Sequence, residues 1–165
     1  MTGKLFVISA PSGAGKTTLV SAIIARLNPP IPIECLITYT TRLPRIDEKD
    51  GIDYHFLTTS EFEIRMQHGY FLDWSSAYGA YYGAPLAVLN KLQQGISVVC
   101  IFDRAGVERL YEHPLISQHS FVPIWIDVPL QTLHMRLMKR NSETPEHIER
   151  RLLLAQKEIE SEQKR

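Results

Sequence analysis

The sequence predicts an α/β fold in which a parallel β-sheet is covered by helices on both faces. Continuous apolar runs at residues 5–8, 98–102 and 121–126 are typical of strands that are buried on both faces. Apolar residues at helical spacing lie between or after these runs, for example at 19–27 and 148–159. Strands that alternate with amphipathic helices favour a parallel sheet with helical crossovers. At 165 residues, the chain fits one domain.

The first apolar run leads directly into a glycine-rich loop. Residues 10–17 read Ala-Pro-Ser-Gly-Ala-Gly-Lys-Thr and fit the phosphate-binding pattern G-x-x-x-x-G-K-[ST], with alanine in the first position. Gly13 and Gly15 allow positive φ angles, which turn backbone N–H groups inward toward an anion. Lys16 can then reach the β- and γ-phosphates, and the Thr17 hydroxyl can ligate Mg²⁺. A glycine-rich turn without function is the alternative, which the preceding strand, the following helix and the Lys-Thr pair disfavour. The predicted triphosphate-binding residues are Ala10, Pro11, Ser12, Gly13, Ala14, Gly15, Lys16, Thr17 and Thr18.

Composition narrows the class of protein and its partners. The formal net charge is zero, so no sequence-wide basic field recruits nucleic acid or an acidic membrane. The N-terminal apolar run is too short for a signal peptide, and no stretch is long enough to span a bilayer. Cys35 and Cys100 are isolated in or beside apolar runs, which favours buried thiols in a reducing compartment. We expect a cytoplasmic protein whose partners are small molecules.

Turn and cap signals divide the first half of the chain. Asn-Pro-Pro at 28–30 is expected to end the first helix, and a strand is expected at 33–38. Ser60 and Glu63 have capping-box spacing for a short helix that ends at Gly69. Short strands are expected at 70–74 and 78–83. Residues 34–83 therefore interrupt the strand–helix alternation, and we interpret them as an inserted substrate-binding subdomain.

The second half returns to that alternation. Pro85 is expected to be the first residue of a helix that runs to about residue 94. The apolar run at 98–102 ends in the carboxylate Asp103, and Asp127 is a candidate cap for a helix through Lys139. Thr144 and the following proline mark the start of the last helix.

Two arginines in the inserted segment form a candidate phosphate clamp. Arg42 and Arg45 flank Pro44, which stiffens their spacing, and Tyr54 follows in the same polar stretch. Guanidinium forks suit phosphate oxygens, so two arginines and a tyrosine hydroxyl could grip a monophosphate. Taken alone, this stretch fits a solvated charged loop equally well.

Taken together with the phosphate loop, the clamp sequence resembles that of the guanylate kinase family. The family's GMP-binding sequence T-T-R-x-P-R-x-x-E-x-x-G-x-x-Y stands here at residues 40–54, and its Y-Y-G segment stands at 81–83. Its common loop A-P-S-G-A-G-K is matched by residues 10–16, so alanine at position 10 is no defect. The resemblance runs from about residue 4 to the end of the chain.

This resemblance implies an enzyme of purine nucleotide metabolism, with MgATP-dependent phosphorylation of GMP, and of dGMP, to the diphosphate. It implies a P-loop NTPase-type sheet in a single domain over 1–165, with a core at 1–33 and 84–136, a monophosphate-binding subdomain at about 34–83, and a helical lid at about 137–150. A C-terminal helix is expected at 145–165. The implied GMP-binding residues are Thr38, Arg42, Arg45, Glu48, Tyr54, Asp73, Tyr82 and Gly83. The implied catalytic residues are Lys16, Arg42, Arg136, Arg140 and Arg151, and the implied Mg²⁺ ligands are Thr17 and Asp103. For Arg136 and Arg140, a helix face paired with carboxylates is the alternative.

Four departures from the family pattern concern the base and the chain end. Asp73 replaces a glutamate that reads guanine, and Ala84 replaces a hydroxyl residue after Y-Y-G. Ile101 replaces the first acid of the family's D-x-D-x-x-G, of which Asp103 is the second. The sequence stops at Arg165, where the family continues with a further strand and helix. These changes keep open a P-loop kinase with another acceptor, such as a different nucleotide or a sugar phosphate. A non-catalytic binding module is the third hypothesis, and the intact phosphate loop disfavours it.

Overall fold

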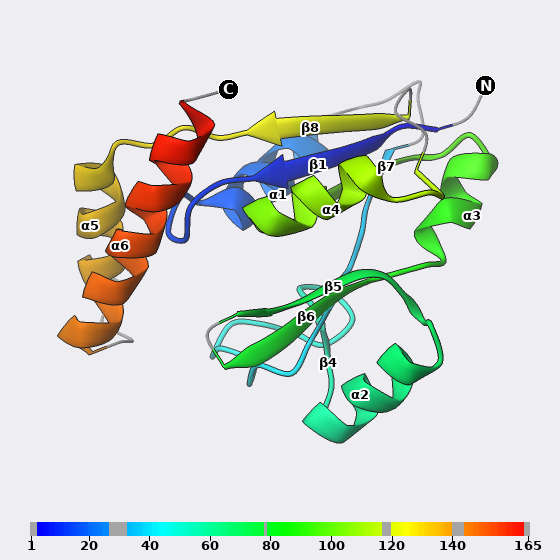
Figure 1. Ribbon diagram of the computed structural model, residues 1–165, viewed down its shortest axis with the longest axis horizontal. Coiled ribbons are helices and arrows are strands. Elements are labelled where there is room, and N and C mark those ends of the chain that lie inside the picture. Colours follow the sequence, from blue (N-terminus) through cyan, green and yellow to red (C-terminus); the bar gives the residue numbers. More distant parts are fainter. Residues whose placement is uncertain (1–2, 27–32, 78, 117–119, 140–143, 164–165) are drawn as a thin grey trace.

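The computed structural model describes residues 3–26, 33–77, 79–116, 120–139 and 144–163. Two sheets lie one above the other in Figure 1, with a pair of helices, α5 and α6, at one end. The larger part contains the first sheet with its helices, and the smaller part contains the second sheet with helix α2.

The first sheet is parallel, with strand order β2-β7-β1-β8. Its strands are β1 (Leu5–Ser9), β2 (Ile33–Cys35), β7 (Ser97–Ile101) and β8 (Phe121–Trp125). Strand β1 lies centrally, where Val7 faces Cys100 of β7 on one side and Pro123 of β8 on the other. The predicted α/β fold with a parallel sheet is confirmed.

Helices cover both faces of this sheet, which explains the unbroken apolar runs. On one face, α3 (Val88–Gln93) and α4 (Arg104–Glu112) place Val88, Leu92 and Leu110 on a cluster with Val7 and Val98. On the other face, α1 (Lys16–Arg26) buries Val20 against neighbouring residues of the same strands. Because successive strand residues point to opposite faces, both must be apolar to be buried.

The second sheet is small and has its own aromatic core. Its order is β4-β3-β6-β5, from β3 (Tyr39–Thr40), β4 (His55–Phe56), β5 (Phe71–Ala77) and β6 (Ala80–Pro85). Helix α2 (Thr59–Gln67) inserts Phe62, which is fully buried and stacks on Phe71 and Tyr81 at centroid distances of 4.4 and 5.2 Å. Gly83 lies against these rings, since a Cβ there would come within 2.7 Å of the Phe71 ring.

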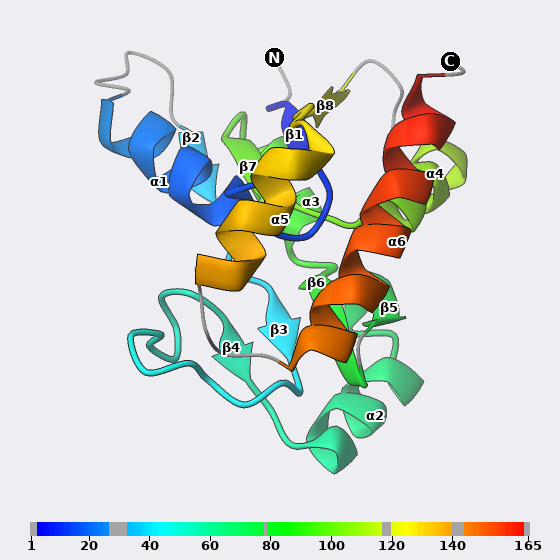
Figure 2. The same cartoon turned by 90° about the vertical axis from the view of Figure 1, so that its left-hand side faces the viewer.

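Helices α5 (Leu130–Lys139) and α6 (Pro145–Glu162) form the third part of the molecule. Figure 2 shows the two helices side by side at the end of the molecule that faces the viewer. Leu133 and Ala155 are buried together with Ala10 and Ala14 of the glycine-rich loop, so this loop packs directly on both helices. The Thr144 side chain caps α6 as predicted, accepting from the His147 N–H at 3.4 Å.

Several element boundaries differ from those predicted. The capping box of α2 is Thr58 with Glu61, not Ser60 with Glu63. Pro85 ends β6 instead of starting a helix, because the next N–H pairs with the Tyr70 carbonyl at 2.9 Å. Helix α5 begins at Leu130, so it is not capped by Asp127. The predicted helix stop at 28–30 lies outside the described residues.

The predicted limits of the inserted subdomain also need correction. Strand β2 belongs to the first sheet through Cys35, so the core continues past residue 33. Strand β6 belongs to the second sheet through Pro85, where it pairs with Phe71, so the insertion continues past residue 83. Cys35 is exposed, contrary to the prediction, whereas Cys100 is buried as predicted. In the part of the chain that the structure describes, no helix has the length and apolar character needed to cross a membrane.

Candidate functional site

A cleft of about 310 Å³ lies where the carboxyl ends of the parallel strands meet the second sheet. Ligands in open parallel sheets bind outside these carboxyl ends, where loops converge. The glycine-rich loop forms one wall, and residues of β5 and β6 form the opposite wall. Because the walls come from different sheets, the cleft can bring two ligands together.

The glycine-rich loop has the geometry of an anion site. Gly13 and Gly15 have φ angles of 91° and 89°, as the sequence predicts, and α1 starts immediately after them. The helix dipole and the inward N–H groups favour a negative charge there. Lys16 curls over the loop, and its Nζ donates to the carbonyls of Ala10 and Pro11 at 2.6 and 3.2 Å.

Arginines from the two flanking helices reach this loop. Arg136 of α5 donates from Nη1 to the Ala14 carbonyl at 2.8 Å, and Arg151 of α6 donates to Ser12 Oγ at 3.3 Å. Arg151 also lines the cleft. The contact of Arg136 with a loop carbonyl does not fit the alternative of a helix face paired with carboxylates. Arg140, the third predicted lid arginine, lies outside the described residues.

Glu158 lines the same wall and was missed in the sequence. Burial raises the pKa of its carboxyl group, while Lys16 and Arg104 oppose that shift and Asp103 adds to it. Glu158 stands seven residues after Arg151, two helical turns along the same face of α6. That spacing is the signal that could have found it.

The predicted phosphate clamp is held by a carboxylate. Arg42 Nη2 lies 2.9 Å from both oxygens of Glu48, and the Arg45 guanidinium lies 3.5 Å from one of them. The Glu48 carboxylate also accepts from the Arg45 N–H at 2.8 Å. Glu48 therefore positions both arginines.

Two tyrosines stand beside the clamp. The Arg42 guanidinium lies 5.6 Å from the centroid of the Tyr54 ring, and Tyr54 meets the Tyr82 ring edge-on at 6.3 Å. Burial raises the pKa of Tyr54, which keeps its hydroxyl protonated at neutral pH as a hydrogen-bond donor. Both tyrosines line the cleft together with Thr38.

The three residues that depart from the family pattern, Asp73, Ala84 and Ile101, all line the cleft. Asp73 pairs with Ala84 across β5 and β6, whereas Ile101 packs with Ile8 and Val20 on the α1 side of the first sheet. Asp73 is 9% exposed and is held by Arg109 of α4, whose Nε and Nη2 lie 2.6 and 2.9 Å from its two oxygens. Arg109 was also missed, because no local pattern joins it to a residue thirty-six positions away.

The model of the family described as guanylate kinase matches residues 2–163. The guanylate kinase of Clostridium perfringens (strain 13 / Type A) is 39% identical over 158 residues, which are 95% of this chain and 70% of that protein. The guanylate kinase of Protochlamydia amoebophila (strain UWE25) is 38% identical over 163 residues, which are 98% of this chain and 79% of that protein. This chain belongs to the guanylate kinase family. The crystal structure of the guanylate kinase from Anaplasma phagocytophilum is 24% identical, with a TM-score of 0.69 over 96% of this chain and 71% of that one, and supports the fold.

The residues that the guanylate kinase resemblance implies gather largely in this one cleft. On the acceptor side, Thr38, Arg42, Arg45, Tyr54, Asp73, Tyr82 and Gly83 line it. On the loop side, Ala10, Ser12, Gly13, Gly15, Lys16, Thr17, Thr18 and Asp103 line it. Glu48 acts behind the clamp instead, and Pro11 and Ala14 are buried in the loop.

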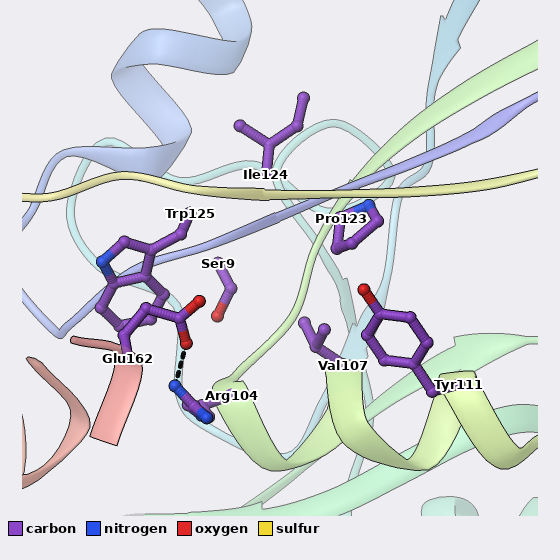
Figure 3. A pocket seen from close by; sticks show the side chains of 8 residues that line it. All are labelled: Ser9, Arg104, Val107, Tyr111, Pro123, Ile124, Trp125 and Glu162. Carbon is purple, nitrogen blue, oxygen red and sulfur yellow. Dashed lines mark hydrogen bonds and ion pairs between the residues drawn. The ribbon is translucent and has the colours of Figure 1, made fainter. Parts of the chain in front are cut away.

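A second cavity has a volume of about 90 Å³, and among the described residues none lines both the cleft and this cavity. Figure 3 shows it between β8, α4 and the end of α6, with the ion pair of Arg104 and Glu162 at its rim. Ser9 Oγ is buried there, and it meets no hydrogen-bond partner within the described ranges of the chain. Its remaining lining is mainly aromatic and aliphatic, so it has none of the phosphate-binding features that guanylate kinases require.

Proposed function

We propose that this chain transfers the γ-phosphoryl group of ATP to GMP, and also to dGMP, giving ADP and the nucleoside diphosphate. The observation that carries the proposal is the single cleft with the triphosphate loop on one wall and the Arg42–Arg45 clamp on the other. Phosphoryl transfer requires the donor and acceptor phosphates in line, and it asks the protein mainly for alignment and positive charge.

The donor side consists of the loop and the cations around it. Backbone N–H groups of residues 13–18 would bind the β- and γ-phosphates, and Lys16 would exchange its loop carbonyls for phosphate oxygens. Arg136 and Arg151 already touch the loop, so a small movement of α5 and α6 would bring their charges onto the transferred group. We include Arg140 by family resemblance.

Thr17 and Asp103 would hold Mg²⁺ between the loop and the end of β7. Both line the cleft, and a hydroxyl with a carboxylate is the hard oxygen donor set that Mg²⁺ prefers beside phosphate groups. Asp103 Oδ1 accepts from the Gly106 N–H at 2.6 Å, which fixes the carboxylate. When bound, Mg²⁺ supplies charge neutralisation at the phosphate oxygens.

On the acceptor side, Arg42, Arg45, Tyr54 and Tyr82 would bind the monophosphate. Its oxygen attacks the γ-phosphorus and is already an anion, so no general base is needed. Thr38 and Asp73 would contact the base, where the carboxylate accepts from the guanine N1–H and 2-amino group. Gly83 lines the cleft and leaves room for the rings behind it, since a Cβ there would come within 2.7 Å of Phe71 and 2.9 Å of Phe62.

Altered acceptor specificity is the second candidate, because Asp73, Ala84 and Ile101, which depart from the family pattern, all line the cleft. A site that reads hydrogen bonds discriminates by about 10⁴-fold, so such changes could redirect it. The favourable loop geometry and the reach of Arg136 and Arg151 argue against a non-catalytic binding module.

Cys35 and Cys100 are free thiols, which suits a reducing compartment such as the cytoplasm.

The test is ADP release by the purified chain with MgATP and either GMP, dGMP, AMP, UMP or no acceptor. We expect turnover with GMP and dGMP well above the other acceptors, and a higher rate with another acceptor would establish altered specificity.

Lys16→Ala should reduce kcat by at least about 10²-fold without unfolding the chain. Lys91→Ala, which removes an exposed ion pair with Glu34 on the core, is the matched control. Equal activity of the two variants would contradict the mechanism.

A further inference from the structure

The contact between Asp73 and Arg109 joins the two parts of the molecule at the base end of the cleft. Asp73 lies on β5 of the second sheet, and Arg109 lies in the last turn of α4 on the first. The guanidinium grips the carboxylate at both oxygens, at 2.6 and 2.9 Å, in the bidentate geometry that fixes a carboxylate in both distance and plane.

The two partners are exposed to different surroundings. The Asp73 side chain is 9% exposed and lines the cleft, whereas the Arg109 side chain is 44% exposed. Within the described part of the chain, Arg109 is not among the residues that line the cleft, so it reaches Asp73 from behind. A carboxylate offers about four lone-pair positions, and a bidentate arginine uses two of them. The other two stay available to a ligand in the cleft.

Helix α4 is shaped to receive this carboxylate. A Cβ at Gly106, one turn before Arg109, would come within 3.1 Å of both Asp73 Oδ2 and Asp103 Oδ1. Two carboxylates therefore meet the helix at nearly the same place, and the charge of Arg109 offsets their repulsion. Hydrogen bonding to Asp73 raises the pKa of Arg109, and the charges of Asp73 and Asp103 act in the same direction.

We propose that Arg109 is a positioning residue that aims the Asp73 carboxylate at the acceptor base and thereby sets the preference for guanine. Aspartate is one methylene shorter than glutamate, and the neighbouring carboxylate of Asp103 is the proposed Mg²⁺ ligand. The Asp73 carboxylate must then provide the recognition of adjacent N–H donors, and an unrestrained side chain would lose that aim. The inference rests on the proposed function, because it assigns the base that the same cleft reads.

The experiment compares kcat and KM for GMP, IMP and ATP in the wild type and in Arg109→Gln and Arg109→Lys. IMP lacks the 2-amino group, so its KM reports how much the carboxylate gains from that donor. We expect Arg109→Gln to raise KM for GMP about tenfold or more, since hydrogen bonds to charged groups have that weight. Its KM for ATP and its kcat at saturating GMP should stay within about twofold, and its preference for GMP over IMP should shrink. Arg109→Lys keeps the charge without the fork and should recover only part of the preference.

A double-mutant cycle with Asp73→Asn tests whether Arg109 acts through that carboxylate. If it does, Arg109→Gln should change KM for GMP little in the Asp73→Asn background. Lys91→Ala, which breaks an exposed ion pair elsewhere on the first sheet, should change none of the constants. Unchanged KM for GMP in both Arg109 variants, or a loss of stability with equal changes in both substrates, would overturn the inference. If the wild type does not use GMP, the proposed function itself fails, and the wild-type arm shows this separately.

Discussion

Phe62 holds the second sheet together, and its removal should destabilise the protein by a predictable amount. The ring is fully buried and stacks on Phe71 and Tyr81, so Phe62→Ala leaves a cavity that the neighbouring rings cannot fill. Such substitutions cost about 3–5 kcal/mol. With an unfolding entropy of about 2.1 cal/mol/K per residue, a chain of 165 residues loses about 9–14 °C in Tm.

Differential scanning calorimetry of Phe62→Ala and of Ile64→Ala measures this effect. Ile64 lies on the same helix but is 53% exposed, so its truncation should change the free energy of unfolding by no more than about 0.5 kcal/mol. Binding of a fluorescent ATP analogue at 20 °C should persist in Phe62→Ala, while KM for GMP rises, because the acceptor wall is built on this core. Equal Tm values for the two variants would refute the argument.

Three further predictions follow from burial and close packing. Burial raises the pKa of Glu158 above its ordinary 4.5, so the folded state holds this proton more tightly than the unfolded chain. The free energy of unfolding of the wild type should therefore fall relative to that of Glu158→Gln as pH rises from 4.5 through the raised pKa. Urea unfolding at several pH values measures both free energies, and a difference between them that does not change with pH would contradict the prediction. Cys35 is exposed, whereas Cys100 is buried and burial raises the pKa of its thiol. A disulfide reagent should therefore modify one thiol in the native protein and both in guanidinium. Rapid modification of both thiols in the native protein would contradict this. Gly83→Ala should lower the free energy of unfolding by about 1–3 kcal/mol, because its Cβ would stand 2.7 Å from the Phe71 ring. Urea unfolding measures this change, and an unchanged unfolding midpoint would disprove the clash.

Local patterns predicted the elements whose signals are contained in a few residues. The loop at 10–17 and the Thr144 cap are of this kind, because a glycine φ angle or a side-chain cap is decided within one turn. The start of α2 was placed two residues late because two capping boxes overlap, Thr58 with Glu61 and Ser60 with Glu63. The first of them is the one that forms, and the helix that it starts places Phe62 in the aromatic core.

The missed parts of the site depend on distant residues. Arg109 and Asp73 meet only because α4 lies beside β5, which no spacing in the sequence records. The role of Glu48 was assigned to GMP by resemblance, whereas its carboxylate engages two arginines of its own loop. Sequence patterns thus identified the residues proposed to bind phosphate, but the groups that hold them in place required the tertiary structure.

The inserted sheet is one uninterrupted stretch of chain between two anchors. Leu36 and Leu86 both pack on the cluster beneath α3 and α4, and the stretch between them contains most of the acceptor wall. The donor wall is instead assembled from segments scattered from Ala10 to Glu158. Recombination or mutation within about fifty consecutive codons could therefore change the acceptor specificity. The segments proposed to bind the triphosphate would stay unchanged. Arg109 limits this independence, because it lies outside the inserted stretch and pairs with Asp73 inside it. A changed insertion must still offer a partner for the Arg109 charge, unless Arg109 changes as well.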